Sequence, residues 1–263
     1  MLTPPEISYF SIGGFPIYYY GIILAVAIFV GIVIANWVAI KHYTLYCVIP
    51  NIATHVVLWG IVGARAYYCI LNWDFYSENL LEIFALREGG LSIHGALIAG
   101  ACVVYYEAKR RKMDILKLFD ICAMGLPIAQ AIGRWGNFFN SEAFGLPTDL
   151  PWKMYIAKPF RPDSYFNNEY FHPTFLYESL LNIVIFIILY KIILPKHKEH
   201  YGFITAWYLI LYSVARIFTE SLRVDCVKYI CGIAFPQIIS VIIIICASLF
   251  LYKRSKKITP YTK

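Results

Sequence analysis

The chain has 263 residues, of which 60% are apolar and 15% are charged, and its formal net charge is +7. A soluble domain usually has about 25% charged residues, so the charges here are too few to cover a surface in water. The composition therefore excludes a water-soluble enzyme, a disordered chain and a nucleic-acid-binding domain, and it favours a protein embedded in a membrane.

Long apolar stretches recur along the chain, and most approach the roughly 20 residues that a transmembrane helix needs. In chain order they predict seven transmembrane helices, at Ile17–Ile40, Pro50–Leu71, Leu91–Tyr106, Leu118–Gly133, Pro173–Leu194, Tyr201–Glu220 and Ile233–Tyr252. The fourth segment contains Asp120 and Pro127, an acidic residue and a helix breaker. We therefore predict an all-α polytopic membrane protein in which residues 1–263 form a single transmembrane domain.

The distribution of Lys and Arg predicts the orientation of these helices. The connections after the first, third and fifth segments and the C-terminal tail together hold most of the 23 basic residues. Because Lys and Arg are enriched in cytoplasmic loops, the N-terminus is expected outside and the C-terminus in the cytoplasm. Topology thus explains most of the positive net charge, which says little about an acidic partner.

The connections on the predicted outer side contain further structural signals. Residues 138–171 are rich in proline and aromatic residues, which predicts a small extracytoplasmic cap. In the loop 72–90, Leu80–Leu86 is predicted as a short interfacial helix. Cys226 and Cys231 lie in a short connection and can form a disulfide if that connection faces an oxidising compartment.

Ionisable and amide side chains recur at one predicted depth, near the outer membrane surface. Charged groups in lipid are costly and usually face a cavity or a partner. The groups at this depth are Tyr20, Arg65, His94, Arg134, Asn137, Asn140, Glu142, Tyr177, Glu178, Arg216 and Glu220. Arginine recognises phosphate through a planar fork of donors, and a histidine with a reference pKa of about 6.5 can take up a proton at neutral pH. Together they favour chemistry on an anionic lipid head group.

Each of these residues also has a structural explanation. Arg216 and Glu220 are four residues apart on a helix and can pair with each other. Arg65 can extend its guanidinium group to the outer interface. His55, on an apolar segment, is typical of a hydrogen-bonded core histidine.

Residues 133–145 read G-R-W-G-N-F-F-N-S-E-A-F-G. This segment resembles the signature G-R-x-G-N-F-x-N-x-E-x-x-G of the bacterial phosphatidylglycerol–prolipoprotein diacylglyceryl transferases. Ser141 departs from the family pattern, in which Gly is usual before the Glu, and Ala96 stands where a second Gly often follows the H-G pair. Both departures are small, and neither removes a charged group.

Other segments, between about residues 18 and 225, share the resemblance. They are Tyr19-Tyr20-Gly21, Gly63-Ala64-Arg65, the H-G pair at His94, the H-P-T-F-L-Y-E run at 172–178, and Tyr212, Arg216, Glu220 and Arg223 in a Y-x3-R-x3-E-x2-R pattern. The family's architecture of seven spans with the N-terminus outside agrees with the spans counted from hydropathy.

The resemblance implies transfer of the diacylglyceryl group of phosphatidylglycerol to the lipobox cysteine of a prolipoprotein, with release of glycerol phosphate. The cysteine thiol must lose its proton to attack, and His94 is the expected base. Cations that neutralise the leaving phosphate lower the barrier, and Arg134 and Arg216 are expected in that role. Glu220 is expected to hold Arg216, which completes the predicted catalytic set.

The remaining predicted residues bind phosphatidylglycerol together with the two arginines. Asn137 and Glu142 are expected to bind head-group hydroxyls or to shape the cavity. Tyr20 and Tyr212 are expected to position the lipid, and Gly145 to allow a turn close to the site.

The implied partners are phosphatidylglycerol, prolipoprotein signal peptides with a lipobox cysteine, and the lipid bilayer of a bacterial plasma (inner) membrane. No cofactor, metal or nucleic acid is expected. Three other classes remain as alternatives: a transporter or channel, a lipid-binding module without catalysis, and an intramembrane protease. The sequence shows neither the repeated halves of many transporters nor a serine or paired aspartates placed at mid-depth for proteolysis.

Overall fold

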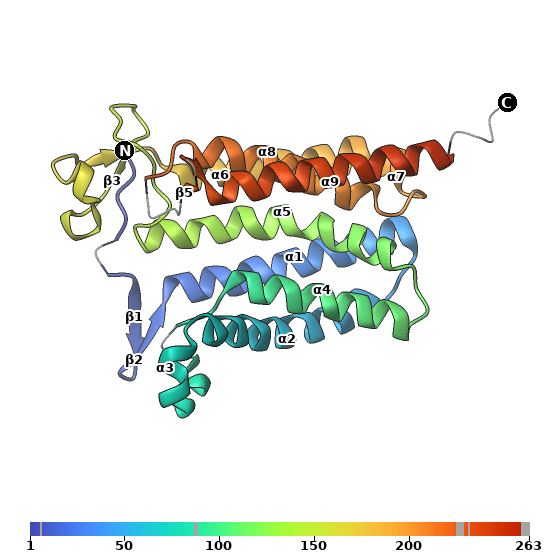
Figure 1. Cartoon of the computed structure of the whole chain (residues 1–263), viewed down its shortest axis with the longest axis horizontal. Helices are drawn as coiled ribbons and strands as arrows, with labels where there is room; N and C mark the ends of the chain where they lie inside the picture. The colour runs from blue at the N-terminus through green and yellow to red at the C-terminus, as the bar shows by residue number, and fades with distance from the viewer. Residues whose placement is uncertain (6, 87–88, 225–228, 231, 259–263) are drawn as a thin grey trace. The chain divides into compact units, whose positions relative to one another are not determined.

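The computed structural model describes residues 1–258 apart from 6, 87–88, 225–228 and 231. Long helices dominate the described chain (Figure 1). They are α1 (Tyr19–Tyr43), α2 (Val48–Leu71), α4 (Ile93–Arg110), α5 (Ile115–Phe139), α6 (Thr174–Ile188), α8 (Phe203–Glu220) and α9 (Phe235–Ile258). Each overlaps one of the predicted segments. A π-helical turn, η5 (Leu189–Ile193), continues α6 into α7 (Leu194–His197).

Among the described residues, five helical segments are long and apolar enough to cross a membrane. They are Tyr19–Tyr43, Val48–Leu71, Ile115–Phe139, Thr174–His197 and Phe235–Lys256. Helices α4 and α8, with 18 residues each, are shorter than the helices of this set. The prediction of a mostly helical, multi-pass membrane protein is confirmed, whereas seven spans and their orientation stay predictions.

Two of the differences between the observed and predicted helix bounds involve other structural features. The predicted first span begins at Ile17, but residues up to Tyr18 belong to a hairpin of β1 (Tyr9–Ile12) and β2 (Phe15–Tyr18), closed by a glycine pair with positive φ. This hairpin was not predicted, because its strands are only four residues long. In contrast, α5 is longer than predicted and continues through Pro127 to Phe139.

Backbone packing divides the chain into two compact units, Ala35–Cys122 and the unit formed by Met1–Ile34 with Ala123–Lys263. In the first unit, α2 and α4 lie side by side. Gly63 and Gly95 face each other at their contact, where a Cβ on Gly95 would collide with the carbonyl of Gly63. Only residues without a side chain permit this close approach.

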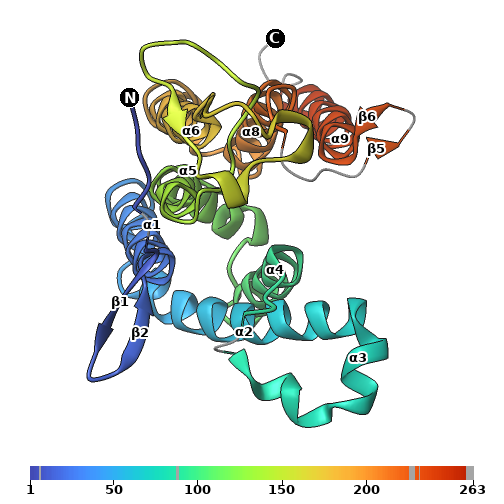
Figure 2. The same cartoon turned by 90° about the vertical axis from the view of Figure 1, so that its left-hand side faces the viewer.

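The loop that follows α2 is folded around one buried arginine. Arg65, 6% exposed, donates hydrogen bonds of 2.5–3.3 Å to backbone carbonyls of the loop. The acceptors are Glu82, Ile83, Ala85, Gly89 and Gly90. The loop contains α3 (Trp73–Glu78) and the 3₁₀ helix η1 (Leu80–Phe84) (Figure 2). A short helix is therefore present within the predicted range Leu80–Leu86, and its interfacial position stays a prediction. Arg65 thus holds the loop from a buried position, and the expectation that it extends its guanidinium group to the outer interface is wrong.

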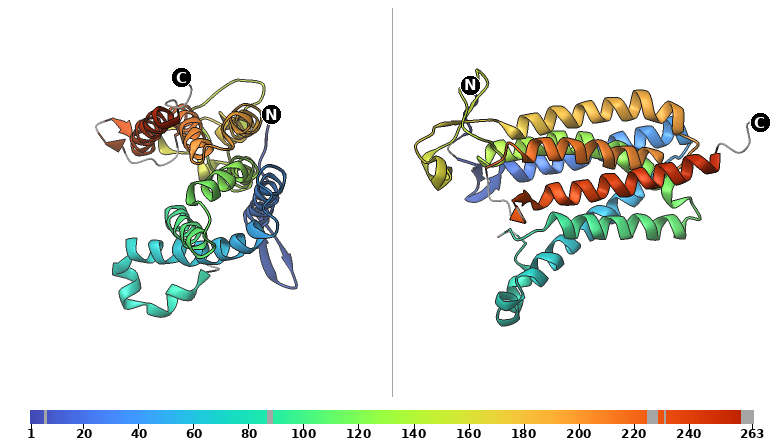
Figure 3. Two further views of the ribbon diagram at one scale, coloured as in Figure 1. Left: turned by 90° about the vertical axis from the view of Figure 1, so that its right-hand side faces the viewer. Right: turned by 45° about the horizontal axis from the view of Figure 1, so that its top comes forward.

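In the second unit, α8 packs against α6 and α9 (Figure 3). The segment between α5 and α6 contains β3 (Met154–Tyr155), paired antiparallel with β4 (Tyr170–Phe171), and the 3₁₀ turns Lys158–Phe160 and Asp163–Tyr165. Its buried core is formed by Ala143, Phe144, Met154, Ile156, Phe171 and Phe175. A short hairpin of β5 (Tyr229–Ile230) and β6 (Ile233–Ala234) precedes α9.

Candidate active site

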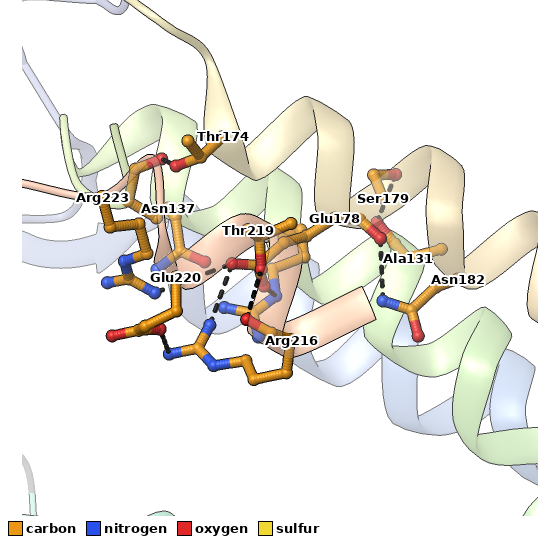
Figure 4. Close-up of polar contacts among 12 residues, drawn as sticks. Ala131, Asn137, Thr174, Glu178, Ser179, Asn182, Arg216, Thr219, Glu220 and Arg223 are labelled. Atoms are coloured by element: carbon orange, nitrogen blue, oxygen red, sulfur yellow. Dashed lines mark hydrogen bonds and ion pairs between the residues drawn. The ribbon is translucent and has the colours of Figure 1, made fainter. Parts of the chain in front are cut away.

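A single carboxylate, that of Glu178, contacts three arginines of the second unit. It lies in the second turn of α6 and is 4% exposed. Its Oε2 is 2.6 Å from Nε of Arg134 on α5, and its Oε1 is 2.9 Å from Nη1 of Arg216 on α8. Arg223 approaches the same Oε1 at 3.7 Å. Figure 4 shows Glu178, Arg216, Glu220 and Arg223 together at this place.

Glu220 completes the cluster from the same helix as Arg216. Its Oε2 is 2.7 Å from Nη2 of Arg216, so the predicted i,i+4 pair is present. Arg216 is thus held at both terminal nitrogens by two carboxylates. Three guanidinium groups and two carboxylates therefore meet in a largely buried cluster.

Arg134 is the least constrained of the two predicted phosphate-binding arginines. It uses Nε for Glu178, and in the described part of the chain no contact engages its two Nη groups. Its side chain is 20% exposed, against 18% for Arg216. The two terminal nitrogens of Arg134 therefore form the fork that is available to a ligand.

Backbone contacts around Gly145 hold the helix ends that carry this cluster. Gly145 donates its N–H to the carbonyl of His172, ahead of α6, and forms an antiparallel bridge with Arg223, after α8. A Cβ at Gly145 would lie 2.7 Å from the carbonyl oxygen of Leu222. A residue without a side chain is required here, and the segment joins the beginning of α6 to the end of α8.

The loop after α5 is held over the helix end by its own polar residues. The side-chain amides of Asn137 and Asn140 donate to the two carboxylate oxygens of Glu142, each at 3.3 Å. The N–H of Glu142 donates to the carbonyl of Asn137 at 2.8 Å. Ser141 has a φ of +55°, a left-handed conformation that glycine adopts without steric cost. This explains physically why glycine suits the position before the Glu in the family signature.

Two predicted tyrosines pack against neighbouring residues in the same unit. Tyr20, in the first turn of α1, lies against the backbone of Gly136, where a Cβ would lie 2.7 Å from its ring. Tyr212, four residues before Arg216, stacks on the buried Tyr208 with ring centroids 5.9 Å apart. Tyr212 is therefore about one helical turn from Arg216 in sequence. Tyr20 packs against Gly136, which is two residues after Arg134.

His94 belongs to the other compact unit. It lies in the first turn of α4, is exposed, and its ring is 6.2 Å from that of Tyr67. Its role as the base therefore stays a prediction. Cys226 and Cys231 lie outside the described residues.

Two members of the cluster, Glu178 and Arg223, were not among the site residues predicted from the sequence. Both belong to the family-like patterns H-P-x-x-L-Y-E and Y-x3-R-x3-E-x2-R, so the signal was present in the sequence. Only the structure shows that Glu178 contacts arginines of α5 and α8.

The fold and the cluster define a multi-pass helical membrane protein with an arginine-rich polar site. A family model described as prolipoprotein diacylglyceryl transferase matches residues 8–253. Three relatives carry the name phosphatidylglycerol–prolipoprotein diacylglyceryl transferase. The protein of Synechococcus sp. (strain CC9902) is 38% identical over 97% of this chain and 96% of its own length. That of Finegoldia magna is 40% identical over 95% and 96%, and that of Fervidobacterium nodosum is 43% identical over 82% and 74%. The chain belongs to the prolipoprotein diacylglyceryl transferase family, which confirms the family indicated by the sequence motifs.

Proposed function

We propose that this chain transfers the diacylglyceryl group of phosphatidylglycerol to the cysteine thiol of a prolipoprotein, an early step of lipoprotein maturation. The observation that carries the proposal is that Arg134 of α5 and Arg216 of α8 both form ion pairs with Glu178 of α6. Two partly buried guanidinium groups held in fixed orientations are suited to a lipid phosphate. Family membership supports the same substrate pair.

The reaction forms a bond between the cysteine sulfur and a glycerol carbon of the lipid. The bond between that carbon and the phosphate oxygen breaks, and glycerol phosphate leaves with the electron pair. The thiol proton passes to a base, for which His94 is the candidate. As negative charge grows on the departing phosphate, the free Nη groups of Arg134 and the clamped guanidinium group of Arg216 stabilise it. Glu178 and Glu220 keep Arg216 oriented before the substrate arrives.

The remaining predicted residues are proposed to bind and position the lipid. Asn137 and Glu142 are proposed to meet the hydroxyls of the head group, and Tyr20 and Tyr212 to position the lipid. Gly145 keeps the two helix ends close together. The protein substrate is proposed to be a signal peptide with a lipobox cysteine.

The proposed setting is a bacterial plasma (inner) membrane, crossed seven times by one transmembrane domain. The N-terminus and the cap at residues 138–171 lie outside, and the C-terminus lies in the cytoplasm. Helices α4 and α8 supply the two spans beyond the five that hydropathy supports, and their polar residues are proposed to face protein instead of lipid.

A transfer assay tests the proposal directly. The full chain in vesicles containing phosphatidylglycerol is mixed with a lipobox peptide, and the peptide mass is measured. We expect the cysteine peptide to gain one diacylglyceryl group and the matched serine peptide to gain none. Binding of the lipid without covalent transfer would contradict an enzyme, and flux across the vesicles without transfer would favour a transporter.

A further inference from the structure

A second charged cluster lies at the end of α4 opposite to His94, within the unit 35–122. The side chain of Glu107 is 3% exposed there, with Oε1 3.1 Å from Nδ1 of His55 on α2. Its Oε2 accepts hydrogen bonds from Nη2 of Arg110 at 3.0 Å and from Nε of Arg111 at 2.9 Å. At 1.5 Å per residue, Glu107 is about 20 Å along α4 from His94. The cluster therefore lies far from the residue proposed to act on the thiol.

A cavity of about 260 Å³ opens beside this cluster. Its lining is formed by residues of α2 and α4, which lie side by side in Figures 1 and 3: His55, Trp59, Val103, Tyr106, Glu107 and Arg110. Trp59 and Tyr106 are 54% and 63% exposed. Amphipathic aromatic rings of this kind are typical of the boundary between the hydrocarbon core and the head groups. The cavity thus combines a polar, charged side with an aromatic side.

The charges of the cluster favour an anion in this cavity. One carboxylate faces two guanidinium groups, which leaves at least one positive charge unbalanced. Glu107 fixes Arg110 through Nε and Nη2, while the Arg110 side chain remains 51% exposed and lines the cavity. An arginine that is oriented by a buried carboxylate is a preorganised hydrogen-bond donor for a phosphate group.

We propose that this cavity binds the phosphate of an anionic phospholipid. In the proposed topology the cavity lies at the cytoplasmic leaflet, where basic pockets between helices bind anionic head groups. Trp59, Val103 and Tyr106 provide the apolar wall that the glycerol and ester region of a lipid requires and that a soluble phosphate does not use. The bound lipid is not a substrate here, and its binding stabilises the packing of α2 on α4.

Photo-crosslinking in nanodiscs tests the site separately from catalysis. The full chain is placed in phosphatidylcholine containing a small fraction of photoreactive phosphatidylglycerol, and labelled peptides are mapped. We expect labelling of the peptides with Trp59 and Tyr106. Arg110→Gln should lower the labelling of these peptides about tenfold or more, because the variant loses one charge-assisted hydrogen bond to the phosphate. The matched control is Lys109→Gln, a neighbouring cation whose Nζ lies 5.9 Å from the ring centroid of Tyr105; it should leave labelling unchanged.

The other outcomes overturn the inference. Equal loss in Lys109→Gln would indicate general surface charge, and equal labelling by photoreactive phosphatidylcholine would remove the preference for an anion. Displacement by millimolar inorganic phosphate would make the ligand a soluble anion. If Arg110→Gln lowers the unfolding temperature, the Arg110→Lys variant is used instead, because lysine keeps the positive charge and lacks the planar fork of donors. Labelling of Arg110→Lys equal to that of the wild type would then contradict the proposal. Transferase activity, measured in parallel, reports on the proposed function alone.

Discussion

Oε2 of Glu178 lies 2.6 Å from Nε of Arg134, and this ion pair joins α6 to α5 at the candidate active site. The other oxygen of the same carboxylate binds Arg216 of α8. Glu178 is therefore a positioning residue for both arginines that are proposed to hold the lipid phosphate.

Replacing Glu178 tests that positioning role. Glu178→Gln removes the negative charge that bridges the two arginines. Loss of one partner of a buried ion pair lowers the free energy of unfolding by about 3–5 kcal/mol. We expect kcat/KM for diacylglyceryl transfer to fall by about 100-fold or more and the unfolding temperature to fall. Glu169→Gln, an exposed glutamate 4.0 Å from Arg161, is the matched control. An active and stable Glu178→Gln variant would contradict the central place of this carboxylate.

The two arginines are expected to respond differently to lysine. Arg134→Lys loses the planar fork and should abolish most activity with little effect on stability, because Arg134 has a single ion-pair partner among the residues that the structure describes. Arg216→Lys should lose activity and also lower the unfolding temperature, since two carboxylates lose their shared partner. Initial rates and thermal unfolding of both variants check this. Near wild-type turnover in both would remove the phosphate-binding role.

Gly145→Ala should damage the site through the backbone. The added methyl group would lie 2.7 Å from the carbonyl oxygen of Leu222, and such overpacking costs about 1–3 kcal/mol. We expect a lower unfolding temperature and slower transfer. Gly133→Ala, on α5, is the matched control, because a Cβ there meets no atom within 4 Å; its unfolding temperature should not fall. Equal stability of the two variants would show that the close contact at Gly145 is unimportant.

Ser141→Gly is expected to stabilise the protein. Ser141 has a left-handed backbone, which costs a residue with a side chain about 1–2 kcal/mol, although glycine recovers only part of this because its unfolded state has more freedom. Thermal unfolding should show a small increase and transfer rates should be kept. A decrease would mean that the Ser141 side chain makes a contribution larger than its strain.

His94→Gln separates lipid binding from proton transfer. If His94 accepts the thiol proton, the variant should lose most transfer activity and still bind phosphatidylglycerol, because glutamine cannot act as a base at neutral pH. Lipid binding and transfer are measured on the same preparation. A fully active variant would exclude His94 from the mechanism.

The sequence predicted the helices well because the length of each apolar stretch and the charges within it can be read directly along the chain. The positions of α5 and α8 placed Arg134 and Arg216 at helix ends, and the i,i+4 spacing of Arg216 and Glu220 predicted their pair. Glu178 was not predicted as the common partner, because a contact between helices depends on packing that no local pattern encodes. The hairpin at Tyr9–Tyr18 was missed since its strands are short.

Arg65 gathers carbonyl oxygens from Glu82 to Gly90, much as a bound cation would. The guanidinium group contacts the main chain of the loop at five carbonyls and one of its side chains, the ring of Tyr76, whose centroid is 5.3 Å from Cζ of Arg65. Most residue types in that loop can consequently be exchanged over evolution without releasing it, whereas Arg65 itself cannot be exchanged for lysine, which lacks the five donors.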